Sequence, residues 1–259
     1  MKDKKGIRKS VFTLAGSFSN SAGYAGKHKW AFTLAEVLIT LGIIGVVAAM
    51  TLPTLIQKYQ EKVTVNKLKK MYSVLSQAYN LYRIDNELEI IPFSAEGAEK
   101  VFNIFKPYLK IATDCGTTNS AAGCFYQGMY KKIHGANHMS YSNEATHRKV
   151  LLADGSSLIF RGRGASVYAN YAMEVFYDVN GGAPPNTWGI DLFEFDFNIE
   201  NGKLEPNGIG DELFQRNCIA ANAGGWGCTA WVIFKGNMDY LHCDGLTWDG
   251  ASSCKDLNN

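Results

Sequence analysis

The sequence lacks the motifs by which most enzyme classes are recognised. It has no Gly-rich phosphate-binding loop, no GxSxG nucleophile motif and no Cys–His dyad. It also lacks a CxxC pair, the spacing on which many zinc sites are built. These absences argue against the enzyme classes that a sequence reveals most readily, and we expect a protein that is not an enzyme.

Charge is nearly absent from residues 32–52, in which Glu36 is the single charged residue. A helix of this length is about 30 Å long, enough to cross the hydrocarbon core of a membrane. The run is too long for the apolar part of a typical secretory signal peptide, and no A-x-A-like cleavage site follows it before Tyr59. We therefore predict a membrane-spanning helix. Because an unpaired carboxylate in lipid is costly, Glu36 should lie beside a cation.

A resemblance to a known family rests on residues 31–53, AFTLAEVLITLGIIGVVAAMTLP. This segment resembles the N-terminus of type IV pilins and type II secretion pseudopilins. The resemblance implies that a prepilin peptidase cuts between Ala31 and Phe32 and that the new amine of Phe32 is methylated. Glu36 becomes the fifth residue of the mature chain, and Pro53 falls where many pilins carry a kinking proline. The family usually has Gly before the cut, where this chain has Ala31.

The resemblance also implies a role for Glu36 in assembly. The ammonium group of Phe32 in one subunit would pair with Glu36 of the next, which relieves the cost of a buried carboxylate. Such a pair sets the axial register between packed helices, as a single buried polar group does in a coiled coil. The alternative is a signal-anchor helix in which Glu36 is incidental.

Charge is unevenly distributed along the chain. Residues 1–31 hold seven Lys/Arg against one Asp, whereas residues 84–259 hold 13 Lys/Arg against 21 Asp/Glu, a net charge of −8. A basic N-terminal flank favours a cytoplasmic N-terminus, although Lys58 to Lys70 makes the other flank basic as well. We expect a single-pass protein of the cytoplasmic membrane with its head outside, which becomes an extracytoplasmic filament after assembly. An acidic head argues against nucleic-acid binding, apart from a local basic patch such as Lys131-Lys132 or Arg161 and Arg163.

The chain divides into three predicted segments. Residues 1–31 form a leader peptide removed by prepilin peptidase, residues 32–83 a long helix whose first part is transmembrane, and residues 84–259 a globular extracytoplasmic head. From Pro53 to Arg83 apolar residues recur at spacings of three and four, so the helix continues as an amphipathic one with its apolar stripe starting at Leu52.

The head is predicted to contain a short helix and a small sheet. Residues 95–110 are an amphipathic helix that Pro107 weakens, and residues 150–160 are a hairpin around Asp154-Gly155. Two more strands follow at 171–179 and 192–199, the second with Glu194 and Asp196 on a solvent-facing side. A last strand is expected at 229–234. The fold class is α+β and pilin-like, with the long N-terminal helix packed on a small antiparallel sheet of three or four strands.

No cysteine occurs in the predicted leader or long helix. The six cysteines are Cys115, Cys124, Cys218, Cys228, Cys243 and Cys254. An even number on one side of a membrane indicates disulfides in an oxidising space. Sequential pairs, 115–124, 218–228 and 243–254, close the shortest loops and are the predicted pairs. The rival interpretation is a metal site that uses His242 and Cys243.

One loop carries oxygen ligands suited to calcium. Asp178 and Asn180 begin a sequence like that of a calcium loop, and Asn186 and Asp191 follow it. Some secretion pseudopilins bind calcium in the head, so the resemblance supports a structural calcium ion here. The competing interpretation is that these residues serve turn geometry. We expect no other cofactor and no other metal.

These observations predict a prepilin-like structural subunit that assembles into a type IV pilus or a type II secretion pseudopilus. Its partners would be other pilin or pseudopilin subunits, prepilin peptidase, the inner-membrane assembly platform and membrane lipid. The alternative is a membrane-tethered extracytoplasmic binding domain that does not polymerise. The sequence leaves open which machine the subunit serves. It also leaves unexplained why residues 11–15 nearly repeat residues 31–35.

Overall fold

The computed structural model describes residues 33–87, 89–117, 126–142, 144–164 and 171–258. Contacts divide the chain into two compact units, Met1–Thr51 and Leu52–Asn259. The predicted leader, residues 1–31, lies outside the described residues, and so do the predicted cleavage residues Ala31 and Phe32. The near-repeat at residues 11–15 lies outside them as well.

The long helix α1 comprises Leu34–Asp85, within two residues of the predicted range at each end. It continues through Pro53 without a break. Up to Thr51 its large apolar side chains, from Leu34 to Met50, are all exposed. Among the described residues α1 is the one helix that is long and apolar enough to span a membrane.

The unit from Leu52 onward contains a six-stranded antiparallel sheet, so the fold class is α+β. Its strands are β1 (Ile111–Gly116), β2 (Arg148–Leu152), β3 (Ser157–Gly162), β4 (Tyr171–Asp178), β5 (Leu192–Asn198) and β6 (Lys203–Pro206). Each strand pairs with the next strand along the chain. The predicted hairpin and the two strands after it correspond to β2 to β5. The predicted number of strands was too low because the two edge strands give weak local signals. β1 shows no alternation of apolar residues, and β6 has only four residues.

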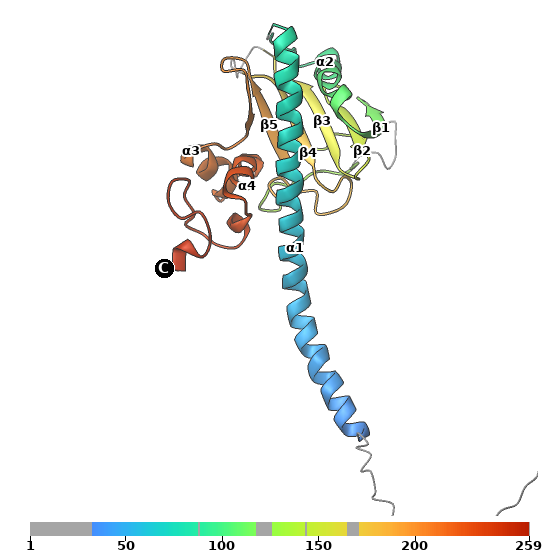
Figure 1. The fold of residues 1–259 in the computed structure, drawn as a ribbon, viewed down its shortest axis with the longest axis vertical. Coiled ribbons are helices and arrows are strands. Elements are labelled where there is room, and N and C mark those ends of the chain that lie inside the picture. The colour runs from blue at the N-terminus through green and yellow to red at the C-terminus, as the bar shows by residue number, and fades with distance from the viewer. Residues whose placement is uncertain (1–32, 88, 118–125, 143, 165–170, 259) are drawn as a thin grey trace, which may run out of the picture. The chain divides into compact units, whose positions relative to one another are not determined.

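The C-terminal part of α1 packs on one face of the sheet (Figure 1). Its buried residues are Val65, Leu68, Met71, Leu75, Ala78 and Tyr79. The ring of Tyr79 meets Phe197 edge to face, with centroids 4.9 Å apart. The predicted stripe started too early, because Leu52, Ile56 and Tyr59 are exposed and the sheet covers α1 only from Val65 onward.

The helix α2 (Ala95–Phe105) lies beside α1 on the same face of the sheet. Ser94 caps its N-terminus by accepting a hydrogen bond from the N–H of Gly97 at 3.0 Å. Phe105 stacks on Phe160 of β3, with ring centroids 5.9 Å apart. The helix ends before Pro107, which lies in the 3₁₀ turn η1 (Lys106–Tyr108), as the predicted weakening at that proline implies.

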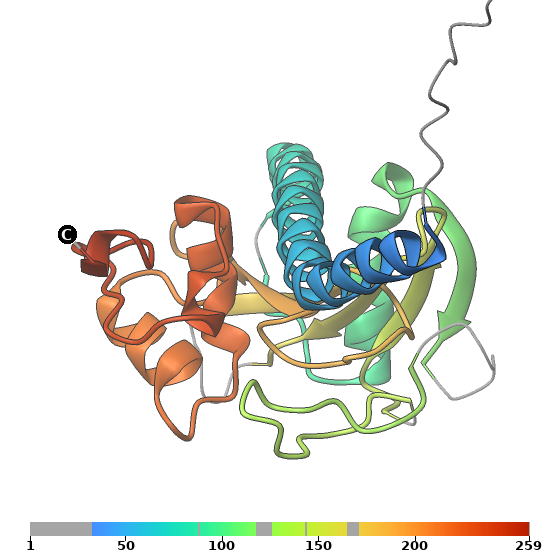
Figure 2. The ribbon, with the colours of Figure 1, turned by 90° about the horizontal axis from the view of Figure 1, so that it is seen from below.

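Loops cover the opposite face of the sheet, which Figure 2 shows on the side away from α1. An aromatic cluster lies there. Tyr141 from residues 126–142 and Trp188 from the β4–β5 connection pack on Phe176, with ring centroids 5.5 and 5.3 Å away. All of β5 is therefore buried. The prediction of a half-buried strand with Glu194 and Asp196 in solvent was wrong.

The C-terminal region consists of short helices beside the β5–β6 end of the sheet (Figure 1). They are α3 (Asp211–Phe214), η2 (Gln215–Ile219), η3 (Trp226–Cys228), α4 (Thr229–Lys235), η4 (Asp239–Leu241) and η5 (Asp256–Asn258). The predicted strand at 229–234 is the helix α4, which ends at Gly236 with a φ of 74°. Glycine in this left-handed conformation is a common helix C-terminus, and it is the signal that the strand prediction missed.

Candidate functional site

A row of charged residues crosses four strands on the sheet face away from α1. The strand register places Arg161 of β3 opposite Glu174 of β4, and Glu174 opposite Asp196 of β5. Asp196 in turn lies opposite Glu205 of β6. Since side chains alternate between the two faces of a strand, Glu194 lies on the same face as Asp196. The sheet therefore gathers residues that are far apart in the sequence.

Ion pairs connect the members of this row. Glu174 is fully buried, and its two carboxylate oxygens pair with the guanidinium groups of Arg161 and Arg163. Nη2 of Arg163 also lies 3.6 Å from Oδ1 of Asp196. Asn207 donates a hydrogen bond to Oδ2 of Asp196 at 2.9 Å. Arg161 and Arg163 therefore do not form an exposed basic patch, because both side chains are mostly buried and paired with a carboxylate.

The protonation of this cluster is strongly perturbed. Burial and, after it, the negative charge of Glu194 raise the pKa of Asp196 to about 8. Burial also raises the pKa of Glu194, against the opposing effect of Arg161 and Arg163. Burial lowers the pKa of Arg161. Each shift favours the uncharged form, as expected where charged groups leave water.

A cavity of about 770 Å³ opens onto the charged row. The cavity is lined by charged residues of the row, Arg161, Arg163, Glu194 and Asp196, and by the rings of Trp188 and Trp226. Those two rings meet edge to face at 6.3 Å between centroids. A concave site of this size, with aromatic rings around a few convergent polar groups, is the common form of a small-ligand pocket.

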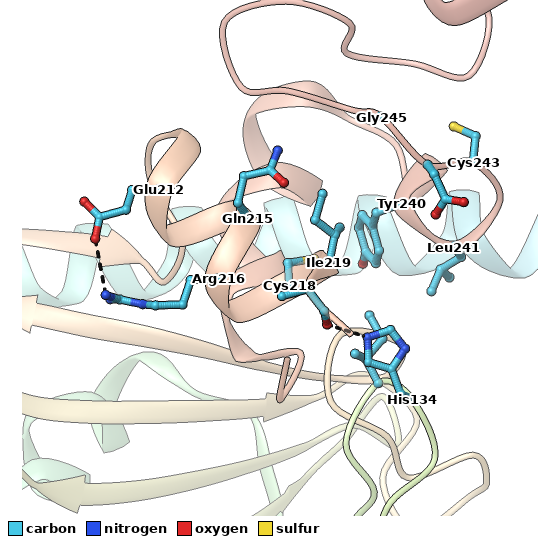
Figure 3. Close-up of a pocket in the computed structure, with 13 residues that line it drawn as sticks. His134, Glu212, Gln215, Arg216, Cys218, Ile219, Tyr240, Leu241, Cys243 and Gly245 are labelled. Carbon is cyan, nitrogen blue, oxygen red and sulfur yellow. Dashed lines mark hydrogen bonds and ion pairs between the residues drawn. The ribbon is translucent and has the colours of Figure 1, made fainter. Parts of the chain in front are cut away.

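A second cavity of about 770 Å³ lies in the C-terminal region (Figure 3). Its residues include the ion pair between Glu212 and Arg216, at 3.2 Å, and His134, whose Nε2 lies 2.9 Å from the carbonyl oxygen of Ala220. Cys218 and Cys243 also line it, and both belong to disulfides. The described lining therefore supplies no thiol nucleophile.

Two of the predicted disulfides are present, Cys218–Cys228 and Cys243–Cys254. The third predicted pair, Cys115–Cys124, cannot be compared because Cys124 lies outside the described residues. The rival metal site at His242 and Cys243 is wrong, since Cys243 is disulfide-bonded and Nε2 of His242 lies 2.8 Å from Oε1 of Glu61.

The calcium candidates lie in one buried region, where their carboxylates accept hydrogen bonds from the protein. Asp178 accepts from the hydroxyl of Tyr130 at 2.5 Å and from the N–H of Asn180 at 3.2 Å. Asp191 accepts from the N–H groups of Asn186 and Thr187 at 2.7 and 2.6 Å. The bonds from backbone N–H groups are those of local turns, which is the role that the competing interpretation gives these residues. The calcium ion stays a prediction.

At the start of α1, Thr33 and Glu36 form a reciprocal cap. The N–H of Thr33 donates to Oε2 of Glu36 at 2.8 Å, and the N–H of Glu36 donates to Oγ1 of Thr33 at 3.2 Å. This is the capping box, which satisfies two helix N–H groups at once. The spacing T-x-x-E before an apolar run is its sequence signal. The carboxylate of Glu36 is thus held at the N-terminus of the helix.

The structure as a whole is an α+β domain that follows a long, apolar N-terminal helix. The chain belongs to DUF6613, a family of unknown function whose model matches residues 54–217. The matched range contains the charged row, and it excludes Glu36 and the two described disulfides. Comparisons with curated proteins and with solved structures found no match.

Proposed function

We propose that this chain is a prepilin-like structural subunit, held in the cytoplasmic membrane by α1 and assembled into a type IV pilus or a type II secretion pseudopilus. The observation that carries this proposal is the exposed apolar surface of α1. Its exposed side chains include Leu34, Leu38, Ile39, Leu41, Ile43, Ile44, Val46, Val47 and Met50. Apolar side chains on all sides of a helix require an apolar environment all round. Lipid supplies it before assembly, and neighbouring helices supply it within a filament.

Glu36 is the single charged residue of this apolar segment. Its carboxylate is held at the helix N-terminus by Thr33, next to the position where cleavage before Phe32 would create a new amine. An ammonium group from an adjacent subunit would neutralise Glu36 and relieve the cost of placing it in an apolar filament core. The two described disulfides are consistent with a head in an oxidising, extracytoplasmic space.

The N-terminus of the protein tests this proposal. The full chain is expressed in bacterial membranes with and without an active prepilin peptidase, and the N-terminal peptide and intact mass are measured by mass spectrometry. With the peptidase, we expect a chain that begins at N-methylated Phe32. Without it, the chain should begin at Met1. A chain that begins at Met1 in both membranes would contradict the proposal.

A second function is favoured by the cavity over the charged row. In this alternative the chain is a membrane-tethered extracytoplasmic binding domain that does not polymerise. Chemical crosslinking in membranes distinguishes the two, since only a subunit should give a ladder of homo- or hetero-oligomers that depends on Glu36. Within the subunit function, surface filaments in electron micrographs would favour a pilus. Loss of a secreted enzyme on deletion of the gene would favour secretion.

A further inference from the structure

The charged row carries more negative than positive charge. Among the described residues, three buried carboxylates, Glu174, Glu194 and Asp196, face two guanidinium groups, those of Arg161 and Arg163. Two further charged residues line the cavity, Glu205 and the exposed Arg216, and their charges are opposite. With all groups ionised, the cluster therefore has an excess of one negative charge.

The residues of this unit that the structure does not describe cannot supply the missing positive charge. They are residues 88, 118–125, 143, 165–170 and 259, and they include no lysine, arginine, aspartate or glutamate. A buried net charge is expensive unless a partner of opposite sign approaches it. A proton on Asp196, whose pKa is about 8, can remove this charge. A positively charged group that enters from outside the head would replace that proton.

Two oxygens at the cavity have no hydrogen-bond donor among the described residues. They are Oδ1 of Asp196 and Oδ1 of Asn207, both buried atoms of residues that line the cavity. Asp196 as a whole is 4% exposed. A buried acceptor without a donor costs free energy, and a ligand that carries N–H groups would satisfy it. The ligand should therefore bring hydrogen-bond donors as well as positive charge.

The aromatic residues that line the cavity also suit a cationic ligand. Trp188, Trp226 and His138 form a cluster in which His138 lies 6.2 and 5.8 Å from the two indole rings. Burial lowers the pKa of His138, so the imidazole is neutral at pH 7 and does not compete as the cation. A cation near the face of a tryptophan ring is attracted by the ring quadrupole. The negative charge, the unpaired acceptor oxygens and the aromatic rings all suit a cationic group that carries N–H donors.

We propose that this cavity binds the guanidinium or ammonium group of an organic ligand, with Asp196 and Asn207 accepting its N–H groups and Trp188 and Trp226 beside it. One positive charge brings the cluster to neutrality. All residues of the site belong to the head, so this proposal does not depend on filament assembly. It holds for a filament subunit and for a tethered binding domain.

A metal ion fits the cluster less well. Carboxylate oxygens of Glu174, Glu194 and Asp196 lie within 4.8 Å of one another, a spacing that a metal could bridge. However, both oxygens of Glu174 are paired with arginine, so a metal would have to displace two guanidinium groups. A divalent ion would also leave the cluster positive instead of neutral.

The test uses the full chain in detergent micelles at pH 9, where Asp196 is mostly ionised, and isothermal titration calorimetry. The probes are the Nα-acetyl methylamides of arginine and lysine, and the control is the same derivative of citrulline, which is close in shape to arginine but uncharged. At least one cationic probe should bind about tenfold or more tightly than citrulline, because only a cation neutralises the buried charge. Equal binding of citrulline, or no binding of either cation, would overturn the proposal.

Variants assign the binding to this cavity. Asp196→Asn removes the excess negative charge and should abolish the preference for cations. Asp244→Asn, which changes an exposed carboxylate at the other cavity, should leave the preference unchanged. Asn207→Ala changes no charged residue, but it removes one acceptor and the amide group that donates to Asp196. It should weaken binding roughly tenfold or more, and it provides a second variant if Asp196→Asn does not fold. Calcium or manganese chloride that binds through Asp196 while the organic cations do not would replace this proposal with a metal site.

Discussion

Asp196 is buried, and its raised pKa makes the stability of the protein depend on pH. The carboxylates near it are Glu194 on the same strand, Glu174 on β4 and Glu205 on β6. The cations near it are Arg161 on β3 and Arg163, which directly follows β3. The folded pKa is about 8, above the ordinary value of 3.8. The folded state therefore binds a proton more tightly than the unfolded chain, and stability falls as the pH rises from about 4 to about 8.

We predict that Asp196→Asn reduces this fall in stability. Asp178 and Asp191 also have raised pKa values, so part of the decrease will remain. Urea unfolding of the wild type and the variant at pH 5, 7 and 9 should show the difference between them growing toward high pH, in favour of the variant. The control is Glu212→Gln, whose carboxylate is exposed. Parallel curves at all three values would show that Asp196 does not hold the extra proton.

Glu36 is the second residue whose charge can be tested directly. We predict that Glu36→Val leaves membrane insertion intact, because it makes the apolar segment more apolar, but impairs assembly, because it removes the partner of the Phe32 amine. Membrane fractionation and filament yield measure the two effects. Thr40→Val is the matched control, since Thr40 is polar, lies one turn further on and bonds only to the carbonyl oxygen of Val37 in the structure. Normal filaments from Glu36→Val would contradict the register role.

At the scale of elements, α1 has two kinds of surface that the periodicity of its sequence does not separate. Leu55 and Leu75 are both apolar residues of the same helix, yet Leu55 is 65% exposed and Leu75 is fully buried against the sheet. The apolar stripe was predicted from spacing alone, so it extended to Leu52. Where the stripe becomes buried depends on the length of the sheet, which no local pattern in α1 reports.

We predict that Leu75→Ala lowers the free energy of unfolding of the head by about 2–5 kcal/mol, because it leaves a cavity between α1 and the sheet. Leu55→Ala makes the same chemical change on an exposed surface and should cost less than about 0.5 kcal/mol. Denaturant unfolding monitored by tryptophan fluorescence compares the two. Similar losses from both variants would mean that α1 does not pack on the sheet in solution.

At the scale of the whole molecule, the two described disulfides close loops of nearly equal length, with sequence separations of 10 and 11. Cys218 and Cys228 are fully buried in the core, whereas Cys243 and Cys254 are partly exposed. The entropic effect of each bond on the unfolded chain should therefore be similar, and the difference between them should come from packing.

We predict that replacing Cys218 and Cys228 together by serine lowers the stability of the head by about 2–5 kcal/mol. The same double replacement of Cys243 and Cys254 should cost less, because it leaves no polar side chains in the core. Urea unfolding under non-reducing conditions gives both values. A larger loss from the second pair would show that loop closure or local contacts in the C-terminal region outweigh core packing.

Local patterns were enough to predict several parts of this protein. The apolar run after Phe32, the hairpin around Asp154-Gly155 and the strands β4 and β5 are each encoded by neighbouring residues, because the period of an apolar pattern reflects the local backbone. The disulfides Cys218–Cys228 and Cys243–Cys254 were predicted because sequential cysteines close the shortest loops. The T-x-x-E cap at Thr33 and the helix end at Gly236 are equally local, because each is encoded within a few neighbouring residues.

The cavity and its charged row could not be predicted in this way. The alternation of phenylalanine with Glu194 and Asp196 indicated a strand with one wet face, and the strand is there. Whether that face meets water depends on the loop at residues 126–142 and on the C-terminal helices, which are remote in sequence. Likewise, Arg161, Glu174 and Asp196 become neighbours only through the register of three strands. Burial and cross-strand pairing are long-range properties, so they emerge only when the whole chain has packed.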